Sequence, residues 1–160
     1  MKSLILFTSS HGTTEKATLL LKENLKGGAE VINLKKNPHL DMSCYDLIVI
    51  GSSIHVGNIA KRMKNFMQKN LSILKSKKLG LFLCCMQEDD EAREQFETAF
   101  SKELREASIS NGLFGGEFLF EKMNFIQRAM LKKVADKTSS VYNLNDKAIK
   151  KFAKEINAAL

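Results

Sequence analysis

The amino-acid sequence predicts an α/β fold, a doubly wound parallel sheet of five strands with helices on both faces. Short apolar runs alternate along the chain with longer amphipathic segments, which is the order that β-α-β units produce. The run at residues 45–50 has no polar face after Asp46, as expected for a strand buried on both sides. A length of 160 residues suits one core. We therefore expect residues 1–160 to form a single domain.

Five segments are predicted to be strands because they are short and apolar. They span residues 3–7, 29–34, 45–50, 79–86 and 114–120. The first begins almost at the start of the chain, and the third and fourth carry the longest apolar runs. The fifth is the least apolar, because Gly115 and Gly116 interrupt it.

Amphipathic segments between and after these runs are predicted to be helices. They span residues 14–25, 59–70, 91–107 and 146–160. In the first, Ala17, Leu21 and Leu25 recur at helical spacing, and two glycines at 27–28 end the helix. The last shows the same spacing of apolar side chains, which we expect to face the sheet.

A further amphipathic segment lies between the fifth predicted strand and the last helix, at residues 121–143. Met123, Ile126 and Met130 recur at helical spacing, and the segment also carries five Lys and Arg side chains. We predict an extra basic helix inserted here. Two interpretations are open: its apolar face packs on the sheet edge, or it contacts a substrate or a membrane surface.

The positive charge is concentrated in the first half of the chain. The formal net charge is +7, and residues 61–78 carry seven basic side chains and no acidic one. This segment is either a solvated helix or a surface for phosphate, anionic lipid or an acidic partner. We expect no nucleic-acid partner.

Several classes of protein are excluded by composition. No apolar run is long enough for a transmembrane helix, and no signal peptide is evident. Three cysteines, two of them adjacent, do not make a disulfide framework, so we expect a cytoplasmic protein. The three histidines are scattered and suggest no metal site.

The segment after the first predicted strand is the strongest candidate site. It contains five hydroxyls and one glycine, in the order Thr8-Ser9-Ser10-His11-Gly12-Thr13-Thr14. In an open parallel sheet, ligands bind beyond the carboxyl ends of the strands. Backbone N–H groups and hydroxyls at a helix N-terminus hold phosphate. The alternative is a Ser/Thr-rich cap that serves only its own helix.

Rival motifs do not fit. A dinucleotide-binding fingerprint needs three spaced glycines, and only Gly12 is present. A P-loop needs Gly-Lys-Ser/Thr, and a nucleophile elbow at Gly51 would need a final glycine that is absent. A phosphoacceptor receiver domain would need acidic residues where Phe7 and Thr8 stand.

The pattern Ser9-x-His11-Gly12-x-Thr14 resembles the FMN-phosphate loop of flavodoxins, whose usual form is Ser/Thr-x-Thr-Gly-x-Thr. Residues 45–54 are similar to the strand that leads into the first flavin-facing loop of that family, and residues 84–90 match the position of the second. The resemblance implies a flavodoxin-like sheet of order 2-1-3-4-5 and FMN as the cofactor.

Within that superfamily the nearest likeness is to the menaquinone-dependent protoporphyrinogen IX dehydrogenases. The stretch at residues 51–57, the Gly115-Gly116 pair and the insert at 121–143 resemble features of that family. His55 and Val56 depart from it, because they stand where familiar members have arginine and tyrosine. Valine cannot stack on the flavin ring as tyrosine does.

The resemblance implies which residues hold the cofactor. The phosphate would be held by Ser9, Ser10, His11, Gly12, Thr13 and Thr14. One face or edge of the ring would be covered by Ser53, Ile54, His55, Val56 and Gly57, with Met86 and Gln87 approaching the other side. No catalytic side chain is required because the flavin carries the chemistry, although His55 is a candidate.

The resemblance also implies an electron-transfer protein or an FMN-dependent oxidoreductase. The expected partners are a redox protein or a quinone, with a tetrapyrrole as candidate substrate. Through residues 121–143 the protein could also contact the inner face of the membrane. A flavin-free binding module with the same fold is the remaining alternative.

For each of three further features, two interpretations remain open. His55 lies either on a flavin edge or in an exposed loop. Cys84 and Cys85 are either small core residues or redox partners. The acidic run at residues 88–91 either favours a helix N-terminus or lowers the flavin potential.

Overall fold

The computed structural model describes residues 1–37, 39–118, 125–126, 129 and 141–160. Its main sheet has five parallel strands in the order β2-β1-β3-β4-β5. The strands are β1 (Ser3–Phe7), β2 (Glu30–Asn33), β3 (Leu47–Ser53), β4 (Lys78–Cys84) and β5 (Ser108–Leu113). The predicted doubly wound sheet is therefore confirmed.

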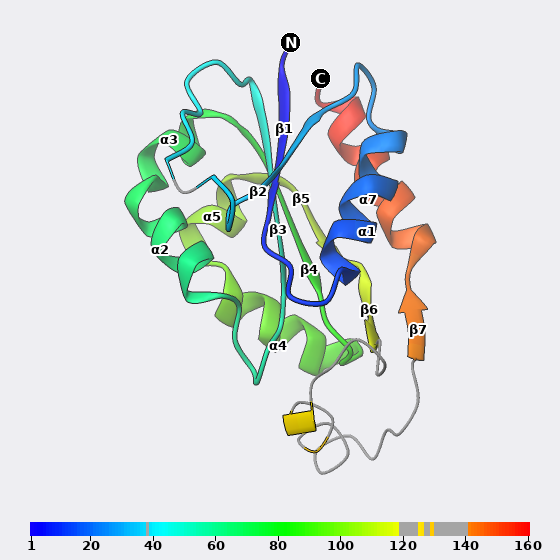
Figure 1. The fold of residues 1–160 in the computed structure, drawn as a ribbon. Coiled ribbons are helices and arrows are strands. Elements are labelled where there is room, and N and C mark those ends of the chain that lie inside the picture. The colour runs from blue at the N-terminus through cyan, green and yellow to red at the C-terminus, as the bar shows by residue number, and fades with distance from the viewer. Residues whose placement is uncertain (38, 119–124, 127–128, 130–140) are drawn as a thin grey trace.

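Helices cover both faces of this sheet (Figure 1). One face carries α1 (Thr13–Asn24) and α7 (Asp146–Ala158). The other carries α2 (Lys61–Lys69), α3 (Leu71–Ser76), α4 (Asp89–Ala99) and α5 (Lys102–Ala107). The predicted helix at 59–70 therefore begins later and is followed by a second short helix. The predicted helix at 91–107 begins at Asp89 and is broken into α4 and α5.

Side chains that alternate along each strand belong to two hydrophobic cores, one on each face of the sheet. In β1, Leu4 and Leu6 join the core under α2–α5, whereas Ile5 joins the core under α1 and α7. All three side chains are completely buried. Because both faces are covered, the central strands are apolar throughout, which is why their sequences were readable as strands.

The predicted fifth strand at residues 114–120 is wrong. The fifth strand of the sheet is β5, which begins six residues earlier in the chain, whereas β6 (Gly115–Phe118) pairs antiparallel with β7 (Val141–Leu144). The strand β5 lies at the sheet edge and is only partly buried, so its sequence SISNGL has few large apolar side chains. Gly112 lies against Phe114 and Phe152, where a side chain would collide.

The predicted basic helix at residues 121–143 lies mostly outside the described residues. Of this segment the structure describes Phe125, Ile126 and Ala129, which are helical, and residues 141–143, which belong to β7, so the predicted helix is wrong at its C-terminal end. Phe125 and Ile126 are strongly exposed. Among the described residues, no helix is long and apolar enough to cross a membrane.

Candidate functional site

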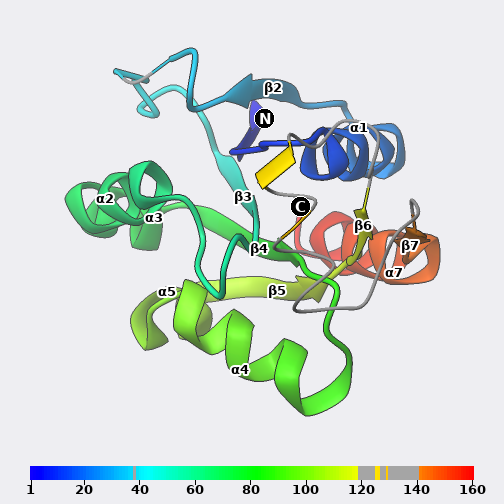
Figure 2. The same ribbon diagram turned by 60° about the horizontal axis from the view of Figure 1, so that its bottom comes forward.

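The loops that follow β1, β3 and β4 gather at one edge of the sheet, because parallel strands end on the same side (Figure 2). All the predicted cofactor-binding residues belong to these loops or to the element ends beside them. The first loop holds Ser9, Ser10, His11 and Gly12 and runs into Thr13 and Thr14 of α1. The second holds Ser53, Ile54, His55, Val56 and Gly57, and the third holds Met86 and Gln87.

The first loop turns sharply into α1. Gly12 is the N-cap residue, with φ at 92°, and no side chain caps the helix. The backbone N–H of Gly12 donates to Ser9 Oγ at 3.0 Å, which closes the loop on itself. The N-cap position is therefore occupied by a glycine and not by a serine or threonine. The alternative interpretation of this segment as an ordinary side-chain cap is not supported.

Thr14 carries a buried hydroxyl in the first turn of α1. Its side chain has no exposed surface, and among the described residues its Oγ1 has no hydrogen-bond partner. Buried polar atoms in proteins are nearly always paired, so an unpaired one indicates a missing partner. An uncapped helix N-terminus beside a buried hydroxyl donor is a donor set that suits a phosphate ester. The residues of this loop therefore fit the phosphate end of a bound ligand.

The second loop contains a tight two-residue turn. His55 N donates to Asn58 O at 2.7 Å and Asn58 N donates back to His55 O at 3.1 Å, so these residues pair like the ends of a hairpin. Val56 and Gly57 between them have φ values of 49° and 75°. A β-branched side chain is strained in this left-handed region. Val56 is also 81% exposed, so no packing in the described structure offsets that strain.

Replacing Val56 by asparagine should stabilise the protein by about 1 kcal/mol, because Asn-Gly is the preferred pair in such turns. Thermal unfolding followed by circular dichroism would measure the gain. Val56→Ala is the control, because alanine removes the branch but remains strained at positive φ. A Val56→Asn variant no more stable than Val56→Ala would contradict this account of the turn.

The first and second loops touch through two histidines. The ring centroids of His11 and His55 lie 5.2 Å apart in an edge-to-face arrangement. Burial and then the charge of Lys35 lower the pKa of His11. Burial, the neighbouring His11 and Lys35 lower the pKa of His55, although its side chain keeps an exposed face. Both shifts favour the neutral form of the rings at pH 7.

This histidine pair makes stability depend on pH. Both pKa values lie below the ordinary 6.5 in the folded protein, so the unfolded chain binds protons more tightly. The contribution to stability is complete above pH 6.5 and is lost as the pH falls through the folded-state pKa values. We expect the melting temperature of the protein, measured without added ligand, to fall as the pH is lowered from about 7 to about 5.

The double variant His11→Gln/His55→Gln should show a smaller fall than the unchanged protein over that range. His39→Gln is the matched control, because His39 is an exposed histidine outside the three loops. Equal pH dependence in the double variant and the control would show that the pair does not contribute.

The third loop is tied to its neighbours through backbone contacts. Ile54 N donates to Cys84 O at 3.2 Å, which joins the second loop to the end of β4. At Gly116 in β6, an added Cβ would lie 2.8 Å from the sulfur of Met86 and 3.0 Å from the Cys85 backbone. Glycine is therefore required for β6 to approach this loop so closely.

The adjacent cysteines behave as core residues. Cys84 and Cys85 are both buried, in opposite cores of the sheet. Burial raises the pKa of the Cys85 thiol to about 11, so it stays protonated at pH 7. This favours the interpretation as small core side chains.

The acidic run lies at the start of α4. Asp89, Asp90 and Glu91 occupy the first turn of that helix, where negative charge is favourable. Asp90 also forms an exposed ion pair with Arg93 at 3.7 Å. The geometry agrees with the structural interpretation, and an effect on a cofactor potential remains a prediction.

Lys35 was missed in the sequence, whereas Arg62, which contacts it, belongs to the basic segment at residues 61–78. Lys35 Nζ donates to Ser9 O in the first loop at 2.7 Å, and Arg62 Nη1 donates to Lys35 O at 2.9 Å. Lys35 follows the end of β2, which lies beside β1 in the sheet. The strand order was therefore the signal that could have placed Lys35 at this site.

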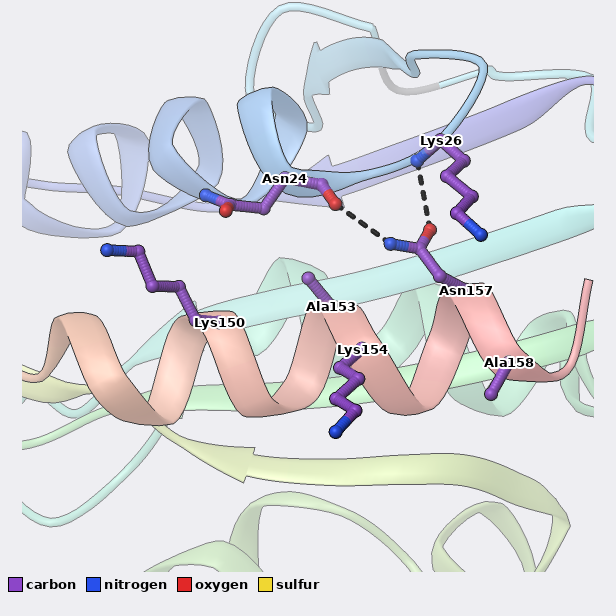
Figure 3. A pocket seen from close by; sticks show the side chains of 7 residues that line it. All are labelled: Asn24, Lys26, Lys150, Ala153, Lys154, Asn157 and Ala158. Atoms are coloured by element: carbon purple, nitrogen blue, oxygen red, sulfur yellow. Dashed lines mark hydrogen bonds between the residues drawn. The ribbon is translucent and has the colours of Figure 1, made fainter.

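A hollow of about 370 Å³ lies between the end of α1 and α7, away from the three loops (Figure 3). Its polar groups bond to one another. Asn157 Oδ1 accepts from Lys26 N and its amide donates to Asn24 O, both at 2.9 Å. Lys150 is paired with Asp146 at 2.7 Å. These contacts hold the two helices together and do not indicate a ligand site.

Comparison with known proteins gives one family match. The model of the flavodoxin domain family matches residues 4–144. None of the curated proteins compared with the chain matches it.

Solved structures show the same fold at low identity. Oxidised flavodoxin 2 from Bacillus cereus is 17% identical, with 100% of each chain covered and a TM-score of 0.63. Two-electron reduced flavodoxin from Megasphaera elsdenii is 14% identical, with 98% of each chain covered and a TM-score of 0.62.

The match to rubredoxin oxygen:oxidoreductase from Desulfovibrio gigas is partial. It is 15% identical with a TM-score of 0.63 and covers 99% of this chain but 35% of that one. The chain therefore spans about a third of that protein. At these identities, all three likenesses show the fold alone.

Proposed function

This chain belongs to the flavodoxin domain family, and we propose that it is a redox protein whose first loop, residues 9–14, holds the phosphate of its flavin. Its cofactor is FMN. When bound, FMN takes up and releases electrons, so the chain itself needs to bind, orient and shield the cofactor. The five-stranded sheet brings the three loops together for that task.

The observation that carries this proposal is the unpaired hydroxyl of Thr14. It is buried in the first turn of α1, after a left-handed Gly12 that leaves the helix without a side-chain cap. A phosphate bound at the helix N-terminus could accept from this hydroxyl, which otherwise has no acceptor among the described residues. The remaining residues of the loop, Ser9, Ser10, His11 and Thr13, would surround the phosphate.

The second and third loops would lie against the ring. Ser53, Ile54, His55, Val56 and Gly57 would cover one face or edge, with Met86 and Gln87 on the other side. The Val56 side chain, 81% of whose surface is accessible, could be covered by the ring. His55 would lie at a ring edge as a neutral hydrogen-bonding group.

The chain offers a matched pair of variants to test the phosphate assignment. Thr14 and Thr18 both have buried Oγ1 atoms without a partner among the described residues, one helical turn apart. Thr14→Val should weaken FMN binding about tenfold, because a hydrogen bond to a charged group is lost. Thr18→Val, at a distance from the helix N-terminus, should bind FMN like the unchanged protein. Equal FMN affinity of Thr14→Val, Thr18→Val and the unchanged protein would contradict the assignment of the phosphate site.

Redox function is tested on the FMN-loaded protein. The flavin would be reduced with dithionite under nitrogen, and an acceptor protein such as cytochrome c would then be added. We expect the flavin to be reoxidised by the acceptor while it stays bound to the protein. A bound flavin that neither accepts nor passes on electrons would contradict an electron-transfer function.

We propose quinone-dependent oxidation of protoporphyrinogen IX as a second candidate function. This second function is favoured by the basic residues of α2, which lie beside the second loop. Their charged groups donate hydrogen bonds to uncharged oxygen atoms. Arg62 binds Lys35 O, and Lys64 Nζ binds Asn58 Oδ1 at 2.8 Å. Positive charges with no acidic partner among the described residues suit the propionates of a tetrapyrrole. Contact with a membrane quinone through residues 121–143 remains a prediction.

The second candidate is tested by adding protoporphyrinogen IX anaerobically to the FMN-loaded protein, with and without a menaquinone analogue. Porphyrin fluorescence that rises above the uncatalysed rate, and rises further with quinone, would support the dehydrogenase. A reducible flavin that ignores this substrate would leave the electron carrier as the function.

A further inference from the structure

Lys35 reaches into the first loop from a neighbouring strand. Its Nζ donates to the carbonyl oxygen of Ser9 at 2.7 Å and lies 3.4 Å from Ser10 Oγ. The residue follows β2, and β2 pairs with β1, so the sheet itself brings this ammonium group to the loop. The contact joins segments that are far apart in the sequence.

The backbone of Lys35 is held on two sides. Its N–H donates to Asn33 Oδ1 at 3.0 Å, and its carbonyl accepts from Arg62 of α2 at 2.9 Å. A lysine side chain is otherwise costly to immobilise, because it has many rotamers. Anchoring the backbone reduces the number of positions that the ammonium group samples.

The charge of Lys35 is not neutralised by an acidic neighbour. Within the described residues, the contacts of its ammonium group are to a carbonyl and a hydroxyl. The same positive charge is felt by both histidines of the site, His11 and His55. Glu15, the one acidic residue in the first turn of α1, is exposed. The side of the site at which the phosphate would bind is therefore electropositive.

From this geometry we propose that Lys35 makes the site select a phosphorylated flavin over riboflavin. It acts as a positioning residue that fixes the first loop through Ser9, and its ammonium group supplies a positive charge to the phosphate dianion. This inference rests on the proposed function, because it assigns the phosphate end of FMN to the loop at residues 9–14. It adds a cation from outside that loop to the backbone and hydroxyl donors within it.

The test compares the dissociation constants of FMN and riboflavin, measured by quenching of flavin fluorescence. Lys35→Met should weaken FMN binding about five- to tenfold and leave riboflavin within about twofold. Lys36→Met is the matched control, because it removes the same charge one residue farther along and should change neither. Lys35→Arg should retain most of the FMN affinity.

Salt dependence separates charge from loop structure. If Lys35 acts through its charge, FMN binding to Lys35→Met should weaken less steeply with added KCl than binding to the unchanged protein. Lys35→Gln should behave like Lys35→Met, because its amide can donate to Ser9 but carries no charge. Lys35→Gln with unchanged FMN affinity and salt dependence would overturn the charge assignment.

Failure of the inference and failure of the proposed function give different results. If the unchanged protein binds FMN and Lys35→Met binds it equally well, the inference is wrong and the function stands. If the unchanged protein binds neither flavin, the proposed function is wrong and the inference falls with it. Thermal unfolding of each variant without flavin verifies that the fold is retained.

Discussion

Replacing Gly12 by aspartate is expected to abolish FMN binding while leaving the protein folded. Gly12 has φ at 92°, a region that Asp and Asn enter more readily than other residues with side chains. An added Cβ at this position meets no atom within 4 Å, so the fold has room for it. The new carboxylate would stand at the N-terminus of α1, where we place the phosphate. Repulsion between the two should weaken binding by at least about 100-fold.

Gly12→Asn is the matched control for this variant. Asparagine has nearly the same shape and the same backbone strain of about 1 kcal/mol, but it carries no charge. FMN titrations should therefore show a much smaller loss for Gly12→Asn than for Gly12→Asp. Equal losses would show that shape or strain, rather than charge, limits binding, and unchanged FMN affinity in Gly12→Asp would place the phosphate elsewhere.

The second large effect is expected at Gly51, in the centre of the sheet. An added Cβ there would lie 2.0 Å from Cζ of Phe82, its partner residue on β4. The Phe82 ring cannot move aside, because it stacks on Phe114 at 4.5 Å and packs against Phe152. Gly51→Ala should therefore destabilise the protein by about 3 kcal/mol, measured by urea unfolding.

A double variant tests the cause of that destabilisation. Phe82→Leu shortens the side chain that occupies the space needed for a Cβ at position 51. Gly51→Ala should therefore lower the free energy of unfolding less in the Phe82→Leu background than in the unchanged protein. Equal cost in both backgrounds would mean that Phe82 is not the obstacle. A single Gly51→Ala variant as stable as the unchanged protein would contradict the packing described for β3 and β4.

The three central strands and the edge strand β2 could be predicted from the sequence, and the other edge strand, β5, could not. The buried segments at β1, β3 and β4 are apolar on both faces, so their sequences identify them without further information. The edge strand β5 has only partial burial and therefore no such pattern. Phe114, which looked like the start of the fifth strand, instead packs across the sheet against Phe82 and Phe152.

Part of the candidate site could also be predicted from the sequence, and part of it could not. Its first loop is a continuous segment, so the hydroxyls and Gly12 were visible in the sequence. The contact between His11 and His55 depends on the pairing of β1 with β3, which places Phe7 beside Gly51. Lys35 was missed because a lysine after a strand is common, and only the neighbouring position of β2 gives it a role.

The most direct test of the account is a titration of the unchanged protein with FMN and with riboflavin, followed by flavin fluorescence. We expect saturation at one FMN per chain, with much weaker binding of riboflavin, because riboflavin lacks the phosphate that residues 9–14 and Lys35 would bind. Absence of saturable FMN binding would contradict the assigned cofactor site. Equal affinity for the two flavins would show that residues 9–14 do not hold the phosphate.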